Sequence, residues 1–97
     1  MAEPLEKAIT DKILKALRNV TGSRGWFKKI HGSPYMSSLP DIIGCFDGRF
    51  VGLEVKRPSN RHGVTPGQQA ELDKLSAAGG LVGVVTSVEE ALTLLGL

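Results

Sequence analysis

The sequence predicts an α/β fold in which a mixed β-sheet is flanked by helices, in the order αβββαβα. Two β-like runs joined by a two-residue turn indicate an antiparallel hairpin. A strand, a helix and a strand then follow one another between residues 50 and 86, which is the composition of a right-handed βαβ crossover. The 97 residues can form one modest core, so we expect a single domain over residues 1–97.

The composition is that of an ordinary globular protein, with 41% hydrophobic and 23% charged residues. The lone cysteine, Cys45, excludes an internal disulfide and a cysteine-based zinc cluster, and we expect its thiol to be buried as a small apolar group. The polar N-terminus lacks the pattern of a secretion signal, and no apolar run is long enough to cross a bilayer. We therefore expect a cytoplasmic protein with no membrane contact.

Charge is divided unevenly along the chain. Residues 1–62 contain eleven Lys and Arg against six Asp and Glu, whereas residues 63–97 contain one against four. A basic region of this kind suits a polyanionic partner such as DNA, because Lys and Arg near phosphates release counterions. A solvated basic face is the alternative interpretation.

The first half of the chain begins with an amphipathic segment. Apolar residues recur at helical spacing from Pro4 to Val20, and Gly22 follows the expected end of this helix. Trp26 to Ile30 is predicted to be a short strand, and the polar segment at residues 31–40 is rich in turn formers.

The hairpin follows at Asp41–Phe46 and Arg49–Arg57, with an Asp-Gly turn between the two runs. Continuing the pairing outward from this turn makes Asp41 and Glu54 direct cross-strand neighbours, with Cβ atoms roughly 5 Å apart, and Lys56 projects from the same face. The opposite face of the second strand is expected to enter the core; it comprises Val51, Leu53 and Val55.

The second half is predicted to contain a helix, a buried strand and a final helix, at Thr65–Ala78, Leu81–Thr86 and Val88–Leu95. Thr65 is a suitable N-cap for the first of these helices. Ser87 and Glu90 form a capping-box pattern before the second. Because the final helix is apolar almost all round, we expect part of it to be covered by a second copy in a two-fold homodimer.

Two opposed carboxylates in a hairpin repel each other, and a bound cation would remove that penalty. Mg²⁺ prefers oxygen ligands and retains several waters, so Asp41 and Glu54 could supply the protein share of a metal site, with the Val55 carbonyl as a further ligand. Lys56 would then orient a nucleophile or offset developing charge. The alternative is that Glu54 and Lys56 form ordinary contacts on a strand surface.

Three segments together carry a family resemblance: LPDIIGCFDGRFVGLEVKRP, TPGQQAELDKLSAAGG and VVTSVEEAL. They resemble a VRR-NUC domain, a virus-type replication-repair nuclease of the PD-(D/E)xK superfamily, over nearly the whole chain. The resemblance implies a restriction-endonuclease-like core and hydrolysis of DNA with Mg²⁺ or Mn²⁺. For stand-alone members from phages and bacteria it also implies a homodimer similar to Holliday junction resolvases, in a bacterial or phage-infected cell. Asp41, Glu54 and Lys56 match the metal-binding and catalytic motif.

Two further residues match functional positions of that family, but each also has a purely structural explanation. Gln68 corresponds to a glutamine near the active-site lysine, but Thr65 and Gln68 also form a capping box. Glu6 corresponds to a first-helix glutamate that can face the metal. The helix dipole equally favours an acid in a first turn, and Glu3 is a rival for the role.

Basic residues on either side of the predicted site are candidates for contact with DNA phosphates. They are Lys28, Lys29, Arg57 and Arg61. His31 and His62 lie in polar segments and are expected to be exposed without a catalytic role. Aromatic residues could stack on bases or belong to the core; they are Trp26, Phe27 and Tyr35.

The interpretation favoured by the sequence is a metal-dependent DNA endonuclease that is selective for DNA structure, with branched DNA as the expected substrate. The alternatives are a catalytically silent nucleic-acid-binding module and a subunit of a replication or packaging complex. The intact Asp41, Glu54 and Lys56 favour catalysis over the binding module.

Overall fold

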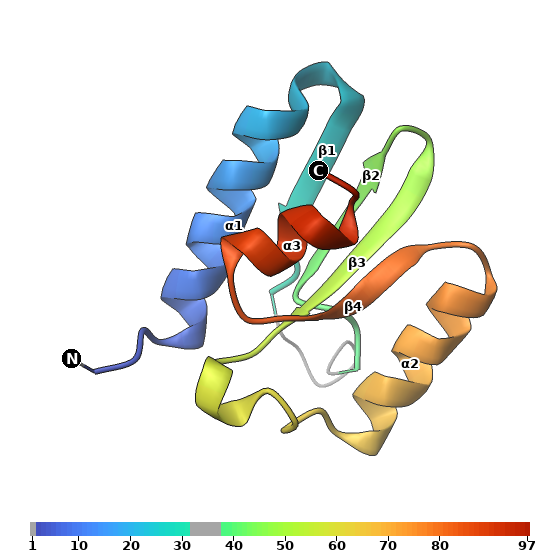
Figure 1. The fold of residues 1–97 in the computed structure, drawn as a ribbon. Coiled ribbons are helices and arrows are strands. Elements are labelled where there is room, and N and C mark those ends of the chain that lie inside the picture. The colour runs from blue at the N-terminus through green and yellow to red at the C-terminus, as the bar shows by residue number, and fades with distance from the viewer. Residues whose placement is uncertain (1, 32–37) are drawn as a thin grey trace.

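The computed structural model describes residues 2–31 and 38–97. One four-stranded sheet has the strand order β1-β2-β3-β4, and helices α1 and α3 cross the face that is turned to the viewer in Figure 1. Helix α2 lies beside β4. The predicted α/β class and the order αβββαβα are confirmed.

The strands are β1 (Gly25–Lys29), β2 (Ile42–Phe46), β3 (Arg49–Val55) and β4 (Leu81–Val85). Strands β2 and β3 form the predicted antiparallel hairpin, with pairing from Phe46↔Arg49 to Ile42↔Leu53. Asp47 and Gly48 both have positive φ angles, of 49° and 82°, as the tight hairpin turn requires. Strand β4 runs parallel to β3, so α2 forms the connection of the predicted βαβ unit.

The helices are α1 (Glu6–Thr21), α2 (Pro66–Ala77) and α3 (Val88–Leu94), with short 3₁₀ turns at η1 (Gly22–Arg24) and η3 (Pro58–Asn60). Helix α1 begins two residues after the predicted Pro4, and Gly22 follows it with a φ of 53°. None of the helices in the described part of the chain is long and apolar enough to cross a membrane.

The core lies between the sheet and the pair α1 and α3. It contains the predicted face of β3, Val51, Leu53 and Val55, all of which are fully buried. Helix α1 contributes one apolar stripe to the same core, which comprises Ile9, Ile13, Leu14 and Leu17. Burial of this one sheet face fixes the register, because a slip of one residue would turn the apolar side chains to the other side.

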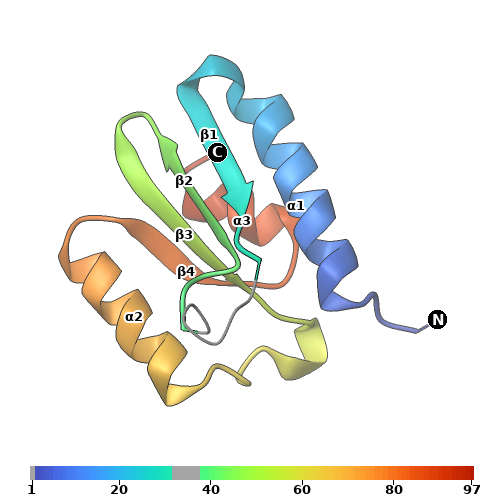
Figure 2. The same ribbon diagram turned by 180° about the vertical axis from the view of Figure 1, so that it is seen from behind.

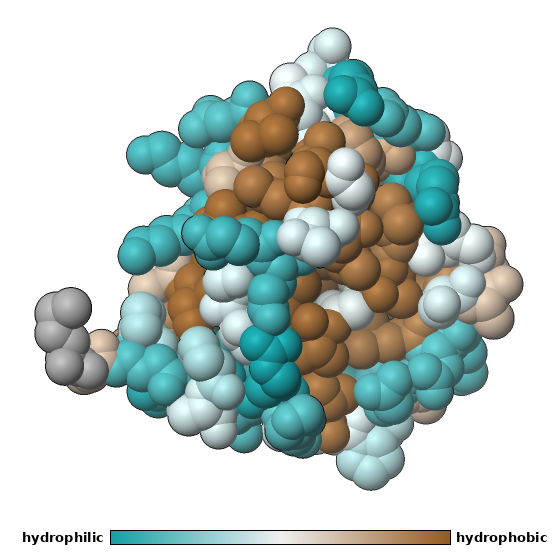
Figure 3. All heavy atoms as spheres, in the orientation of Figure 1, coloured by the Kyte–Doolittle hydropathy of each residue, from teal (hydrophilic) through white to brown (hydrophobic). Residues whose placement is uncertain are grey.

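Helix α3 is more fully covered within one chain than its sequence indicates. Ala91 and Leu95 are buried in the core, and Val88, Leu92 and Leu94 pack against it. Figure 3 shows apolar surface over α3 and the strands beside it, bordered by hydrophilic side chains. Val88, Leu92 and Leu94 remain partly exposed, so the homodimer that would cover them stays a prediction.

On the opposite face, none of the helices that the structure describes lies over β1 or β2 (Figure 2), and α2 reaches only the end of β3, where Gln68 contacts Glu54. Trp26, Cys45 and Phe50 are all exposed there. The prediction that Cys45 is buried is wrong, because its place in the strand alternation turns it away from α1. This open face includes Glu54 in the same alternation, so it is the face on which the candidate site lies.

Candidate functional site

Glu54 and Lys56 stand at the end of β3 and are buried, with exposed fractions of only 2% and 9%. The Lys56 ammonium lies 3.8 Å from Glu54 Oε1. The alternative of ordinary surface contacts does not hold for this pair, because a surface pair would remain solvated. Charged residues are rarely buried unless a partner or a bound ion compensates for lost hydration.

Asp41 lies one residue before β2, and its carboxylate is used differently from the prediction. The ladder ends at Ile42↔Leu53, so Asp41 and Glu54 do not form a further regular pair. Instead, Asp41 Oδ2 accepts a hydrogen bond of 2.7 Å from the backbone N–H of Val55. This contact holds the Asp41 carboxylate at Val55, two residues beyond the last paired residue of β3, Leu53.

Pro40 explains both the end of the ladder and the position of the Val55 carbonyl. Continuing the register would place Val55 opposite Pro40, but proline has no N–H to donate. In an extended strand the N–H and C=O of one residue point to the same side, so the Val55 carbonyl points toward the Asp41 side, where Pro40 cannot bond to it. Pro40 is fully buried and packs over Gly52, where an added Cβ would lie 3.1 Å from Pro40 Cγ.

Gln68 forms the predicted helix cap and also contacts the candidate site. Its backbone N–H donates to Thr65 Oγ1 over 3.1 Å, and its Oε1 accepts from the Thr65 N–H over 2.9 Å, which completes the capping box. Its Nε2 also donates to Glu54 Oε1 over 3.2 Å. The helix cap therefore fixes the side chain that orients Glu54.

The surroundings of Glu54 disfavour its negative charge. Burial raises the pKa of Glu54 to about 8; the charge of Asp41 acts in the same direction, Lys56 opposes it, and Glu6 adds to it. Glu6 therefore acts on the same site from the first turn of α1. A carboxyl in these surroundings holds its proton at neutral pH unless a cation replaces that proton.

Glu3, the rival of Glu6, is occupied elsewhere. Its Oε1 accepts hydrogen bonds from the Ser59 N–H and Oγ over 3.1 and 3.0 Å, and Arg57 Nε lies 3.4 Å away. The Ser59 backbone N–H is the main cause that lowers the pKa of Glu3. The structure thus separates Glu3, which ties the N-terminus to η3, from Glu6, whose charge contributes to the raised pKa of Glu54.

The donor set fits a divalent cation. Glu54 Oε2 is buried and has no hydrogen-bond partner among the described residues, although its other oxygen contacts Gln68 and Lys56. The described ranges contain no group of three His, Cys, Asp or Glu side chains arranged to hold a metal by themselves. Asp41, Glu54 and the Val55 carbonyl would thus be a partial ligand set, which suits Mg²⁺ because that ion retains several waters.

The predicted DNA-contacting residues fall into two groups. Lys29 lies 3.7 Å from Asp11 on the α1 side of the sheet, Arg57 pairs with Glu3, and Arg61 Nη2 lies 2.6 Å from Glu90 Oε2. Lys28 is exposed on the open face and forms no ion pair with any residue that the structure describes. Among the four residues, Lys28 has the clearest access to a phosphate.

The Arg61–Glu90 pair is part of a network that the sequence did not indicate. Ser87 Oγ accepts from the Glu90 N–H as predicted, but the Glu90 carboxylate accepts from the Thr86 N–H and hydroxyl instead of from Ser87. The Thr86 hydroxyl is the main cause that lowers the pKa of Glu90. The expected reciprocal capping box is therefore only half formed, because the glutamate closes the preceding turn.

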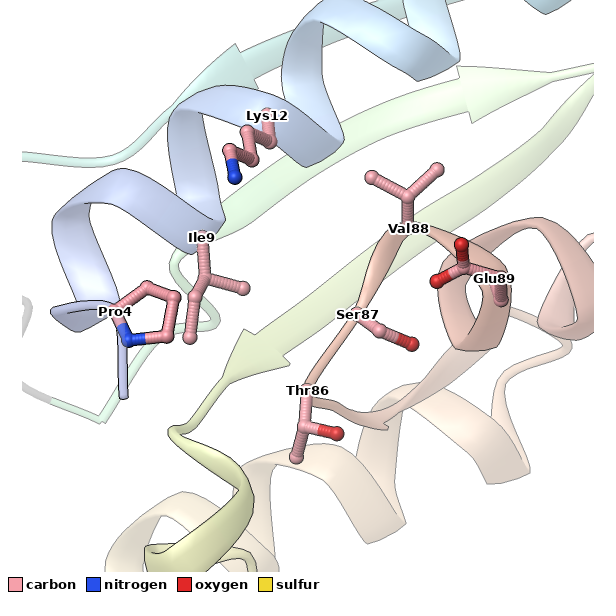
Figure 4. A pocket seen from close by; sticks show the side chains of 7 residues that line it. All are labelled: Pro4, Ile9, Lys12, Thr86, Ser87, Val88 and Glu89. Carbon is pink, nitrogen blue, oxygen red and sulfur yellow. The ribbon is translucent and has the colours of Figure 1, made fainter. Parts of the chain in front are cut away.

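The remaining predicted residues lie outside this cluster. His31 and His62 are exposed, as expected, and Phe27 is a core residue whereas Trp26 is open to solvent. Tyr35 lies outside the described residues. A hollow of about 250 Å³ between the start of α1 and the start of α3 includes Ile9, Lys12 and Val88 but none of the clustered carboxylates (Figure 4).

The fold matches two solved structures. One, described as a "VRR_NUC domain", superposes with a TM-score of 0.64 at 21% sequence identity, covering 89% of this chain and 92% of the other. A second, a "VRR_NUC domain protein", gives a TM-score of 0.66 at 14% identity, covering 98% and 88%. No protein-family model and no curated protein matches the sequence. The VRR_NUC fold expected from the sequence motifs is thereby confirmed.

Proposed function

We propose that the protein is a Mg²⁺- or Mn²⁺-dependent deoxyribonuclease of the PD-(D/E)xK type that hydrolyses phosphodiester bonds in DNA. The observation that carries this proposal is the buried Glu54 carboxylate, which has one oxygen without a hydrogen-bond partner in the described part of the chain. Asp41, Lys56 and Gln68 lie beside it. The likeness in fold to the VRR_NUC structures supports the same activity.

Each side chain of the cluster has a distinct role in this proposal. Gln68 holds Glu54 Oε1, so that Oε2 is directed to the cation. The Val55 N–H fixes Asp41. Glu6, whose charge contributes to the raised pKa of Glu54, is proposed to act on the ion directly or through water. When bound, the divalent cation would polarise a phosphodiester oxygen and lower the pKa of a water molecule.

Lys56 is the proposed catalytic cation. Its ammonium is held near Glu54 at the end of a rigid strand, and it retains donors for an attacking water or a phosphate oxygen. A fixed positive charge in a site shielded from bulk water stabilises developing negative charge more strongly than a solvated lysine does. Burial of Lys56 therefore favours a role in the transition state over a role in general attraction of DNA.

The direct test is a cleavage panel of four-way junctions, flaps, nicked duplexes and linear duplexes, with Mg²⁺, Mn²⁺ or EDTA. We expect cleavage with either ion, strongest on branched DNA, and none with EDTA. Cleavage that is unchanged by EDTA would contradict the metal-dependent assignment. DNA binding without cleavage of any substrate, with either ion, would favour the binding-module interpretation.

We further propose that the active form is a two-fold homodimer, which matches the symmetry of a four-way junction. Two features support it: the partly exposed apolar residues of α3, and β4, an edge strand with partly exposed apolar residues and no charged residue. Such an edge can continue its pairing with a second chain. A monomer by light scattering at micromolar concentration, with full activity, would overturn this proposal.

A further inference from the structure

The open face of the sheet is organised in three rows that run across its strands. One row contains Trp26, Cys45 and Phe50, which are direct cross-strand neighbours; we call it the aromatic row. The next row contains Lys28, Ile43 and Gly52. Asp41 and Glu54 each lie one residue beyond the last pair of β2 and β3, in the place of a third row but without direct pairing. Because side chains on one face recur every second residue, neighbouring rows lie roughly 7 Å apart.

The aromatic row is an apolar surface in the open. Trp26 is 56% exposed and Phe50 38% exposed, and none of the described helices covers β1 or β2 on this side (Figure 2). Phe27, the neighbour of Trp26, is buried in the core. The core therefore already receives one aromatic side chain from β1, and Trp26 lies outside it. An exposed tryptophan on a rigid strand contributes little to the core and is a common feature of binding surfaces.

The row between the aromatic row and the carboxylates is suited to a nucleic acid strand. Lys28 is exposed there and has no ion-pair partner in residues 2–31 and 38–97. Gly52 is buried beneath Pro40, and Ile43 is only partly exposed, so Lys28 is the exposed side chain of this row. A lysine between a stacking side chain and a phosphodiester site follows the alternation of base and phosphate along one strand.

We propose that Trp26 is a stacking site for an unpaired base of the DNA substrate, with Lys28 contacting the adjacent backbone phosphate. This inference rests on the proposed function and names its substrate class: DNA with unpaired nucleotides a short distance from the cleaved bond, as in a flap or an open junction. Paired bases present only their edges to a protein surface, whereas an unpaired base exposes a face that can stack on indole. The aromatic row therefore selects for local strand separation.

Trp26 is the only tryptophan in the chain, so its fluorescence reports on this surface alone. In EDTA, which prevents the proposed metal-dependent cleavage, a single-stranded oligonucleotide or a flap should quench Trp26 emission in a saturable manner. A blunt duplex should raise the anisotropy of a DNA label without that quenching. Equal quenching by both, or binding of the flap without quenching, would overturn the proposal.

Substitutions separate stacking from burial of apolar area. Trp26→Phe should retain flap binding, whereas Trp26→Leu and Trp26→Ala should weaken it about 5- to 100-fold, the scale of one lost base stack. Leu5→Ala, at an exposed apolar residue outside the sheet, is the matched control and should change nothing. If Trp26→Leu binds flaps as the wild type does, stacking is excluded.

The fluorescence experiment also detects whether a second copy of the chain, and not DNA, covers Trp26. In that case Trp26 emission would shift to shorter wavelength with increasing protein concentration in the absence of DNA, and that result would overturn the proposal. The outcome is also distinct from failure of the proposed nuclease. Selective quenching by unpaired DNA from a protein that cuts nothing would support the stacking site and reject the catalytic assignment.

Discussion

Glu54 and Glu90 each have a basic partner, but their surroundings shift the pKa of the two carboxyl groups in opposite directions. Both oxygens of Glu90 accept hydrogen bonds, from Thr86 and Arg61, and the pKa of Glu90 is lowered. Glu54 is more deeply buried, lies near Asp41 and Glu6, and its pKa is raised. An ion pair that satisfies its carboxylate stabilises the fold, whereas one that leaves a buried oxygen without a partner indicates a site that requires a ligand.

The largest expected difference between the two pairs is in catalysis. Lys56→Met should lower the single-turnover cleavage rate by about a hundredfold or more, since it removes a charge that acts in the transition state. DNA affinity should change little, because one phosphate contact among several is lost. Glu90→Gln, which breaks the other pair, is the control and should retain a rate near that of the wild type. A Lys56→Met protein that cuts as fast as the wild type would refute the assigned role.

The same comparison predicts opposite effects on stability without metal. Glu90→Gln should destabilise the protein by about 1–2 kcal/mol, because hydrogen bonds to a charged carboxylate are weakened. Glu54→Gln should raise the free energy of unfolding at pH 8 in EDTA, because a neutral amide replaces a carboxylate that burial disfavours. Urea unfolding of both variants measures the difference. If both substitutions destabilise the protein to the same extent, the claim that burial disfavours the charge of Glu54 is wrong.

The pH dependence of stability should show the same contrast. The folded-state pKa of Glu54, about 8, exceeds its unfolded value of 4.5, so the folded protein binds the extra proton. Its stabilising contribution is complete below pH 4.5 and is lost as the pH rises toward 8, with a slope of at most about 1.4 kcal/mol per pH unit. Glu90, with a lowered pKa, acts in reverse and loses its contribution as the pH falls below 4.5.

Urea titrations in EDTA between pH 5 and 8 measure this dependence. Glu54→Gln should flatten the decline, and Glu90→Gln should leave it unchanged. A wild-type protein whose stability is constant over this range would show that Glu54 is charged in the absence of metal.

The smallest predicted effect is a difference in stability and cleavage rate between substitutions of two adjacent glutamines, Gln68 and Gln69. Gln68→Ala removes both the reciprocal half of the cap at Thr65 and the hydrogen bond to Glu54, so it should cost about 1 kcal/mol of stability and also reduce the cleavage rate. Gln69→Ala removes only an exposed hydrogen bond to Asp73 and should affect neither property. Equal cleavage by the two variants would limit Gln68 to its capping role.

The hairpin and the crossover could be predicted from the sequence because local signals determine them. The Asp-Gly turn sets the register, and alternation of apolar residues in β3 selects the buried face. Cys45 shows the limit of that approach. Cysteine is usually buried, but the predicted register pairs Cys45 with Phe50, on the face opposite Val51 and Leu53, so its residue type is a poorer guide than its place in the strand.

The sequence predicted which residues lie together at the end of β3, but not the contacts that they form. The motif identifies Asp41, Glu54 and Lys56, yet the Asp41–Val55 hydrogen bond depends on how Pro40 ends the ladder. The pairing of Arg61 with Glu90 joins residues 29 positions apart, and no periodicity indicates it. Long-range partners of charged side chains are set by tertiary packing, which the local pattern does not contain.

The most direct test of the account is titration calorimetry of Mn²⁺ binding without DNA. The wild-type protein should bind Mn²⁺ and release protons, with affinity that increases as the pH approaches 8, because the ion competes with the proton on Glu54. Glu90→Gln should bind as the wild type does. The double variant Asp41→Asn, Glu54→Gln should lose binding, whereas undiminished binding by that variant would contradict the claim that these two carboxylates hold the metal.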